Sequence, residues 1–344
     1  MTLALASSRL PGSTNAREPA ETLPTKPLRV AFFGSPAFAL PTLDALNQSH
    51  DVVLVVSQPD KPAGRGLALR APAVASRARE LGLELVQPRG VRGEAFLQRL
   101  AATRPDVGVT AAYGRILPPA LLAIPRHGVL NVHASLLPAY RGAAPVQWAL
   151  INSERETGIS VMQTEEGLDT GPVRLQRRTP IRPEDDALTL MDRLARLGAQ
   201  TLIESLDLLG EGTLPSTPQD DSAATLAPLL TSQDGHVRWT DTAEDVLARH
   251  RGVAAWPGTS FGHAGARVKV LEMTLDGRPA PSPSAARSGA AGPGSVLAVT
   301  QMGMTVMTGA GTVLLERVKP PGARAMSAHE WSLGRGAREG EILG

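Results

Sequence analysis

The sequence predicts an α/β protein: a doubly wound, mostly parallel sheet followed by a small β-barrel. Over the first 210 residues, short apolar runs alternate with helical patterns, which is typical of a parallel sheet covered by helices. After residue 229 the pattern changes to short apolar runs separated by Gly and Pro, which is typical of a small barrel. The length of 344 residues is sufficient for two domains, each with its own core.

The expected strands of the first domain are short and apolar. They span 28–33, 52–56, 84–86, 107–109, 128–132, 157–163 and 171–175. The run at 52–56 is continuous and mainly β-branched, which predicts a strand buried on both faces. Helices are expected over 73–81, around Phe96, and from about 185 to 209, where Asp185 or Asp186 can cap the helix. This alternation places the ligand site at the carboxyl ends of the strands.

Composition changes divide the chain into four parts. We expect a disordered extension at 1–27, a catalytic α/β domain at 28–210, a linker rich in Ser, Thr, Pro and Asp at 211–229, and the barrel at 230–344. The expected barrel strands span 236–239, 268–271, 295–299, 304–307 and 312–315, with a low-complexity loop at 281–293.

Composition also excludes several kinds of site. The chain has no cysteine, so disulfides, thiolate metal sites and cysteine nucleophiles are excluded. Aromatic residues make up only 3%, which argues against RNA binding by rows of stacked aromatic rings. The formal charge is +2, and the lysines are few: Lys26, Lys61, Lys269 and Lys319. We find no apolar run long enough for a membrane span and no secretory signal, and we expect a cytoplasmic protein.

Asn131 and His133 are the strongest candidates for chemistry. They follow the apolar run 128–130, and residues two apart on a strand point to the same face. An amide donor beside a titratable imidazole at the end of a strand suits a reaction at a carbonyl group. The structural alternative is a polar strand end whose side chains hydrogen-bond to backbone.

Two further loops are candidates. Asp169 lies between glycines in Gly167–Gly171, where the backbone can approach a ligand closely and the carboxylate could act on the proton of His133. Alone, such an aspartate is more often a solvated turn residue. The segment Gln58–Gly66 (QPDKPAGRG) places Lys61 and Arg65 on a loop that could bind phosphate, or could be a flexible surface loop. A dinucleotide site fits poorly, because the first strand leads into GSPAFA, without the second and third glycines of that fingerprint.

Taken together, these motifs resemble the 10-formyltetrahydrofolate-dependent formyltransferases. The resemblance runs from about Arg29 to Met326 and rests on four segments: QPDKPAGRG at 58–66, AYGRILP at 112–118, NVHASLLPAYRGAAPVQW at 131–148 and GLDTGP at 167–172. The last two are specific for the formyl-transfer domain, and the first distinguishes the enzymes that act on methionyl-tRNA. The resemblance implies a Rossmann-like catalytic domain followed by an OB-like, tRNA-binding barrel.

The resemblance also implies roles for individual residues. Asn131, His133 and Asp169 correspond to the catalytic set. The folate-contacting segment corresponds to Ser135, Leu136, Leu137 and Pro138, and Lys61 and Arg65 to a tRNA-contacting loop. The chain differs in having Leu67–Arg70 where relatives often have more lysine, and Arg324 where the family has lysine before Ala-Met-Ser.

The implied reaction transfers the formyl group of 10-formyltetrahydrofolate to the α-amine of methionine on initiator tRNA, without a metal, in an enzyme that we expect to be a monomer. Two alternatives stay open. The acceptor could be a small amine, such as a sugar nucleotide or glycinamide ribonucleotide. The chain could also be a nucleotide- and RNA-binding protein without chemistry.

Overall fold

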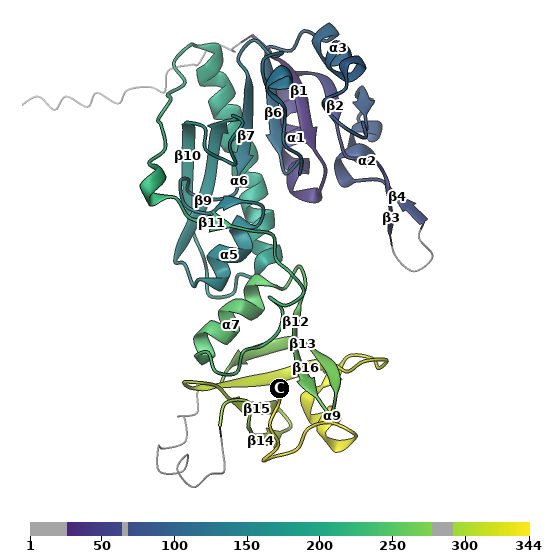
Figure 1. Ribbon diagram of the computed structural model, residues 1–344, viewed down its shortest axis with the longest axis vertical. Coiled ribbons are helices and arrows are strands. Elements are labelled where there is room, and N and C mark those ends of the chain that lie inside the picture. The colour runs from purple at the N-terminus through teal and green to yellow at the C-terminus, as the bar shows by residue number, and fades with distance from the viewer. Residues whose placement is uncertain (1–25, 64–67, 277–291) are drawn as a thin grey trace, which may run out of the picture.

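The computed structural model describes residues 26–63, 68–276 and 292–344 (Figure 1). The predicted extension at 1–27 lies outside the described residues except for its last two positions, as does most of the predicted low-complexity loop at 281–293. The α/β domain and the C-terminal sheet domain lie one above the other, with α7 (Ala243–Gly252) between them (Figure 1).

A seven-stranded sheet forms the centre of the first domain. Its strands are β1 (Arg29–Gly34), β2 (Asp51–Val56), β5 (Leu85–Val86), β6 (Val107–Ala111), β7 (Val129–His133), β9 (Glu156–Gln163) and β10 (Val173–Pro180). They lie in the order β10-β9-β7-β6-β1-β2-β5, and the five strands from β7 to β5 are parallel. Only β9 is antiparallel to its neighbours β7 and β10. The prediction of a mostly parallel sheet is confirmed.

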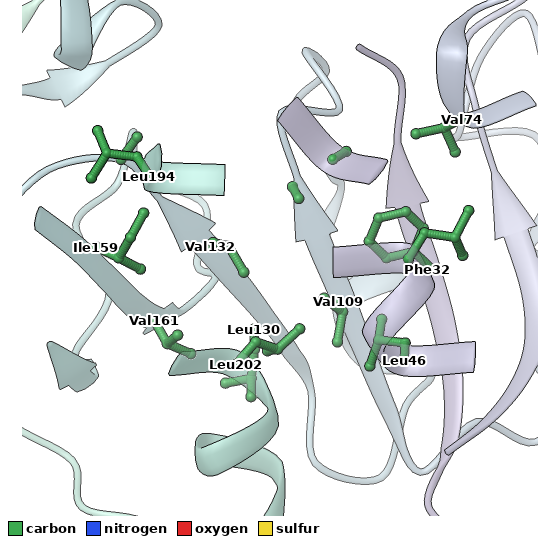
Figure 2. Packing of buried hydrophobic residues seen from close by; sticks show 14 of the residues in the cluster. Phe32, Leu46, Val74, Val109, Leu130, Val132, Ile159, Val161, Leu194 and Leu202 are labelled. Atoms are coloured by element: carbon green, nitrogen blue, oxygen red, sulfur yellow. The ribbon is translucent and has the colours of Figure 1, made fainter. Parts of the chain in front are cut away.

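Helices cover both faces of this sheet. They are α1 (Leu40–Ser49), α2 (Ala73–Glu80), α3 (Glu94–Ala102), α4 (Pro119–Leu122), α5 (Pro145–Ile151) and α6 (Ala187–Gly210). Along β1, Val30 and Phe32 pack in one cluster with α1, α2 and α6 (Figure 2), whereas Ala31 and Phe33 pack in another with α3 and α4. Burying each such large side chain stabilises the fold by roughly 1.5–3 kcal/mol. Alternation along an all-apolar strand therefore fills two cores, as a doubly wound sheet requires.

The long helix α6 begins with a complete capping box. The Asp186 carboxylate accepts from the backbone N–H groups of Leu188 and Thr189. In return, the Thr189 hydroxyl oxygen accepts from the Asp186 N–H. Asp185, the other predicted cap, instead forms an ion pair with Arg193 at 2.6 Å. The α6 N-terminus is therefore fixed by the side chains of its own first two turns and of the residues just before it.

The second domain is an antiparallel sheet rolled around its own core. Its strands are β12 (Thr259–His263), β13 (Ala266–Leu275), β14 (Val296–Thr300), β15 (Gly303–Met307), β16 (Thr312–Lys319) and β17 (Met326–Ser327), followed by α9 (Ala328–Leu333). The order is β12-β13-β16-β15-β14, with β17 beside β16. The C-terminal tail joins the two edge strands: the Gly344 backbone pairs with Gly262 of β12, and the Glu341 carbonyl accepts from the N–H of Val296 of β14. The tail thereby closes the predicted barrel.

Two segments differ from the prediction. Residues 236–239 form no strand: His236 makes a single bridge to Ser260, although Val237 and Trp239 are buried in the barrel core. Within the predicted linker 211–229, β11 (Leu226–Ala227) pairs with β8 (Arg141–Gly142) of the first domain. This segment is therefore folded onto the α/β domain instead of running free between the domains.

The two domains meet through α5 and α7. A Cβ added to Gly252 would lie 2.6 Å from the Ile151 side chain, so the two helices approach closely at this glycine. Beside it, the Arg251 guanidinium donates to the backbone carbonyls of Asp185 and Arg182. His250 lies two residues before Gly252 on α7, and its Nδ1 lies 2.8 Å from the Thr259 hydroxyl. The interface thus combines apolar contact with backbone hydrogen bonds.

Burial of His250 should make the stability of the protein depend on pH. Burial lowers the pKa of His250 from 6.5 to about 4, although Asp186 opposes this shift. The unfolded chain therefore binds a proton at higher pH than the folded chain does. The contribution of neutral, buried His250 to the free energy of unfolding is complete above pH 6.5. As the pH falls towards 4, the free energy of unfolding decreases by about 3 kcal/mol, because each unit of pKa shift corresponds to about 1.4 kcal/mol.

His250→Asn, which keeps an atom facing Thr259 but does not titrate, is expected to remove this dependence. Urea unfolding of both proteins at pH 7 and pH 4 measures it, because the carboxylates common to both cancel in the difference. Equal pH slopes for the two proteins would contradict the assignment.

Candidate active site

Asn131 and His133 project from the same face of β7. The residues alternating with them, Leu130 and Val132, belong to the core that α6 covers. Both polar side chains instead reach the carboxylate of Asp169: Asn131 Nδ2 lies 3.4 Å from Oδ1, and His133 Nδ1 lies 3.6 Å from Oδ2. The structure therefore brings together the three residues proposed as the catalytic set.

Thr110 fixes the orientation of the Asn131 amide. Thr110 lies directly opposite Asn131 on the parallel strand β6, and its hydroxyl donates to Asn131 Oδ1 at 2.7 Å. The amide nitrogen must then face the Asp169 carboxylate, which only accepts. One Nδ2 hydrogen is directed at Asp169 over a long contact, so the amide can also donate to a ligand.

The hydrogen-bond partners of His133 fix which ring nitrogen faces Asp169. Nε2 lies 2.9 Å from the Tyr140 carbonyl oxygen, and since a carbonyl only accepts, Nε2 carries a hydrogen. Nδ1 therefore faces the Asp169 carboxylate, and a proton on Nδ1 would make this contact an ion pair. The His133 side chain is only 6% exposed, so solvent has little access to its ring nitrogens.

The strongest contact of Asp169 is with a backbone amide. Gly142 N–H donates to Oδ2 at 2.8 Å, shorter than the contacts to Asn131 and His133. Gly142 has φ +125°, and a Cβ there would lie 2.7 Å from the Ala227 carbonyl oxygen. A glycine is therefore needed where the amide turns towards the carboxylate while the chain passes close to β11.

Asp169 itself has a left-handed backbone, with φ +53°. Aspartate tolerates this region better than most residues, but the conformation persists only where its surroundings hold it. Gly171 makes room for the loop: a Cβ there would lie 2.0 Å from the Gln163 carbonyl oxygen. This glycine therefore allows close packing against the chain's own backbone, whereas the sequence suggested close approach of a ligand.

The loop after His133 is rigid because its polar groups bond to other parts of the domain. The Tyr140 hydroxyl donates to Glu154 at 2.6 Å, and the Tyr140 N–H donates to the Thr225 hydroxyl at 2.8 Å. Burial and the bond to Glu154 raise the pKa of Tyr140 to about 12, so its phenol stays neutral. The Tyr140 carbonyl is thereby fixed as the acceptor for His133.

The four residues of the proposed folate segment differ in accessibility. Ser135 and Leu137 are buried, and the Ser135 hydroxyl donates to the Ala139 carbonyl at 2.6 Å. The Leu137 carbonyl accepts from Gln176 at 2.8 Å. Leu136 and Pro138 are partly exposed. Ser135 and Leu137 therefore act as framework, and only Leu136 and Pro138 offer side-chain surface to a ligand.

The proposed tRNA-contacting loop is only partly described. Lys61 begins a hairpin of β3 (Lys61–Ala63) and β4 (Ala68–Arg70) that extends from the domain (Figure 1). Its Nζ donates to Gln58 Oε1 at 2.9 Å, and it lies directly opposite Arg70. Arg65 lies outside the described residues. The structure therefore places Lys61 on an exposed hairpin outside the seven-stranded sheet.

Sequence reasoning missed four groups that shape the site: Thr110, the Tyr140 carbonyl, the Gly142 amide and Gln219. Two of them are backbone groups, which leave no residue-type signal. Thr110 could have been found from strand register, since it lies one strand away at the same level as Asn131. Gln219 gave no signal, because it lies in a segment whose composition is typical of a linker.

Two further kinds of site are absent from the part of the chain that the structure describes. Among these residues there is no group of three or more His, Asp or Glu side chains placed to hold a metal ion. None of the helices in the described ranges has the length and apolar character needed to cross a membrane.

Comparison with known proteins identifies the family. Residues 28–206 match the sequence profile described as formyl transferase, and residues 229–336 match that of the formyl transferase C-terminal domain. The chain belongs to the formyl transferase family. It is 50% identical to a protein of Deinococcus radiodurans named methionyl-tRNA formyltransferase, over 91% of this chain and 94% of the relative. A protein of the same name from Thermus thermophilus is 48% identical, over 92% of this chain and 99% of the relative.

Solved structures share the fold at low sequence identity. An N-formyltransferase from Helicobacter canadensis, solved with folinic acid and dTDP-3-aminofucose, has a TM-score of 0.64 at 14% identity, over 84% of this chain and 98% of that one. HypX from Aquifex aeolicus in complex with tetrahydrofolic acid has a TM-score of 0.59 at 17% identity, over 90% of this chain. The present chain spans about half of HypX, 47% of its length.

Substituting Gly142 should disable the site without unfolding the protein. Gly142→Ala adds a Cβ that clashes with Ala227 and must shift the amide that holds Asp169. We expect turnover to fall about 10- to 100-fold, because a displacement of about 1 Å at a catalytic group can cost roughly 100-fold. Gly82→Ala is the matched control, since Gly82 also has positive φ (+68°) but open space around it. Steady-state rates decide: equal effects of the two substitutions would contradict a specific role for the Gly142 amide.

Proposed function

We propose that the protein transfers the formyl group of 10-formyltetrahydrofolate to the α-amine of methionine on initiator tRNA. The observation that carries this proposal is the meeting of Asn131, His133 and Asp169, which joins an oriented amide donor, a proton-bearing imidazole and a carboxylate at one point. The names of the relatives with about 50% identity support methionyl-tRNA as the acceptor.

The reaction needs no group beyond these three and the two substrates. The methionine amine attacks the formyl carbon, a new C–N bond forms, and the carbonyl oxygen becomes an oxyanion. Asn131 Nδ2 and His133 Nδ1 donate to that oxygen. Asp169 takes a proton from the attacking amine, directly or through water. The intermediate then collapses: the bond between the formyl carbon and N10 breaks, N10 receives the proton held by Asp169, directly or through water, and tetrahydrofolate leaves.

Two pairs of like charges support an RNA acceptor. Lys61 lies directly opposite Arg70 on the β3–β4 hairpin, and Lys269 lies directly opposite Lys319 on the barrel. All four side chains are exposed. Like charges facing each other across two strands are destabilising unless an anion bridges them. A phosphate backbone would supply such an anion at both places.

A hollow in the barrel adjoins the Lys269–Lys319 pair. It has a volume of about 580 Å³, and its lining includes Trp331, Met326, Arg335 and the prolines that follow Lys319. The lining is mainly apolar and also includes His263 and the carboxylate of Glu330; its apolar part and the Arg335 guanidinium suit the base and the phosphate of a nucleotide. We propose that this face of the barrel binds the body of the tRNA.

Removal of single catalytic groups should lower turnover by different amounts. Asn131→Ala removes one oxyanion donor and should cost about 100-fold or more in kcat. Asp169→Asn keeps the shape but cannot take the proton, and should cost roughly 100- to 10,000-fold. Formylation of charged initiator tRNA with 10-formyltetrahydrofolate measures both. Asn47→Ala, on the exposed side of α1, and Asp192→Asn, on α6, are the matched controls.

Near-normal turnover of either catalytic variant would overturn the mechanism. The same assay with amino-sugar nucleotides in place of tRNA tests the acceptor. Faster formylation of the sugar would overturn the tRNA assignment but not the chemistry.

The lysine pairs should control affinity for tRNA and its salt dependence. Lys269→Ala and Lys319→Ala should each raise KM for charged tRNA, leave kcat unchanged, and reduce the slope of log affinity against log salt by about 1. Lys61→Ala and Arg65→Ala should act in the same direction. Lys26→Ala removes an exposed lysine that belongs to neither pair and is the control. An unchanged salt slope in all four variants would contradict the phosphate contacts.

A further inference from the structure

Gln219 lies in the segment 211–229, whose composition predicted a linker, yet its side chain reaches the loop that carries Asp169. We propose that Gln219 is a positioning residue that holds the Asp169 carboxylate in its working orientation. This inference rests on the proposed role of Asp169 and adds a residue that no sequence motif of the site contains.

The Gln219 amide uses both of its ends. Its Nε2 donates to the backbone carbonyls of Asp169, at 2.8 Å, and Gly171, at 2.7 Å. Its Oε1 accepts from Arg141, from Nε at 3.1 Å and from Nη2 at 2.9 Å. One side chain therefore connects the loop of Asp169 to the loop of Arg141.

This connection closes a ring through the catalytic carboxylate. Arg141 directly precedes Gly142, whose amide donates to Asp169 Oδ2 at 2.8 Å. Gln219 thus binds the Asp169 backbone from one side. Gly142, which follows Arg141 in the chain, binds the Asp169 side chain from the other. The two contacts together determine where the carboxylate points.

The backbone of Asp169 needs such support. Its φ of +53° is left-handed, and residues in that region persist only where several contacts fix them. Because the side-chain direction follows the backbone, rotation of the Asp169 peptide would move Oδ1 and Oδ2 away from Asn131 and His133. Two hydrogen bonds from a single amide to the carbonyls of residues 169 and 171 oppose that rotation.

Gln219 is itself held in place from both sides. Two residues before it, the Thr217 backbone exchanges hydrogen bonds of 2.9 and 2.8 Å with Val173 of β10. Two residues after it, Asp221 forms an ion pair with Arg141 at 2.7 Å. Further along, β11 pairs with β8. The segment is therefore anchored firmly enough for one side chain to act as a fixed donor.

Two substitutions at Gln219 separate positioning from simple packing. Gln219→Ala removes the donor and the volume. Gln219→Glu keeps the volume and strengthens the contact with Arg141, but it sets a carboxylate against two carbonyl oxygens. We expect kcat to fall about 10- to 100-fold in Gln219→Ala and at least as far in Gln219→Glu, with KM for both substrates changed less than 3-fold, since a 1 Å displacement of a catalytic group can cost roughly 100-fold.

Thr217→Val is the matched control, because that residue contributes its backbone and its side chain is exposed. It should keep kcat within about 2-fold of the parent. Thermal unfolding of all variants establishes that each is folded at the assay temperature. If Gln219→Glu is faster than Gln219→Ala, volume and the Arg141 contact matter instead of the donor, and the proposal fails.

A double variant distinguishes this failure from failure of the proposed function. If Gln219 acts through Asp169, then Gln219→Ala combined with Asp169→Asn should be no slower than Asp169→Asn alone. An independent, multiplied loss would overturn the positioning role. If Asp169→Asn itself keeps normal turnover, the proposed function fails, whatever Gln219 does.

Discussion

The site depends on one contact, the hydrogen bond from the Gly142 amide to the carboxylate of Asp169. It is the shortest contact of that carboxylate, and it fixes the third member of a set whose other two members, Asn131 and His133, are placed by the sheet. The rest of the domain can be understood as support for this contact. The antiparallel strand β9 directs its loop back towards β7, and β11 holds the chain at Gly142 from the other side. A charge is thereby oriented before substrate arrives, which avoids reorganisation during the reaction.

Local pattern was sufficient to predict most of the first domain. Continuous apolar runs such as Val52–Val56 indicate buried parallel strands, because only two-sided burial removes the need for alternation. The helix α6 could be predicted from the spacing of its apolar residues and from its cap.

Prediction failed where the local sequence pattern and the tertiary context differ. Val237 and Trp239 are buried as a strand would require, but only His236 of that run finds a strand partner, so burial alone produced a false strand. The closure of the barrel by Gly344 could not be predicted either, because it pairs residues some 80 positions apart, from 262 to 344.

The site was predictable to the extent that side-chain type and strand period determine it. Asn131 and His133 were paired by a two-residue period, whereas their contacts with Asp169 are visible only in the structure. The resemblance to formyltransferases suggested Asp169, whereas its isolated sequence context did not. The Gly142 amide and the Tyr140 carbonyl carry no side-chain signal, and Gln219 is brought to the site by pairings between distant segments. Composition classed residues 211–229 as a linker because Ser, Thr, Pro and Asp also suit an extended chain that lies against a domain.

The central claim is that Asn131, His133 and Asp169 act as one unit. The most direct measurement is the single-turnover rate of formyl transfer to charged initiator tRNA, determined by rapid quench for each single alanine variant and for the triple variant. Residues that act as a unit give strongly non-additive losses. If the three residues act together, the triple variant will be about as slow as the slowest single variant. Losses that multiply across the three positions would show three independent contributions and would contradict the central claim.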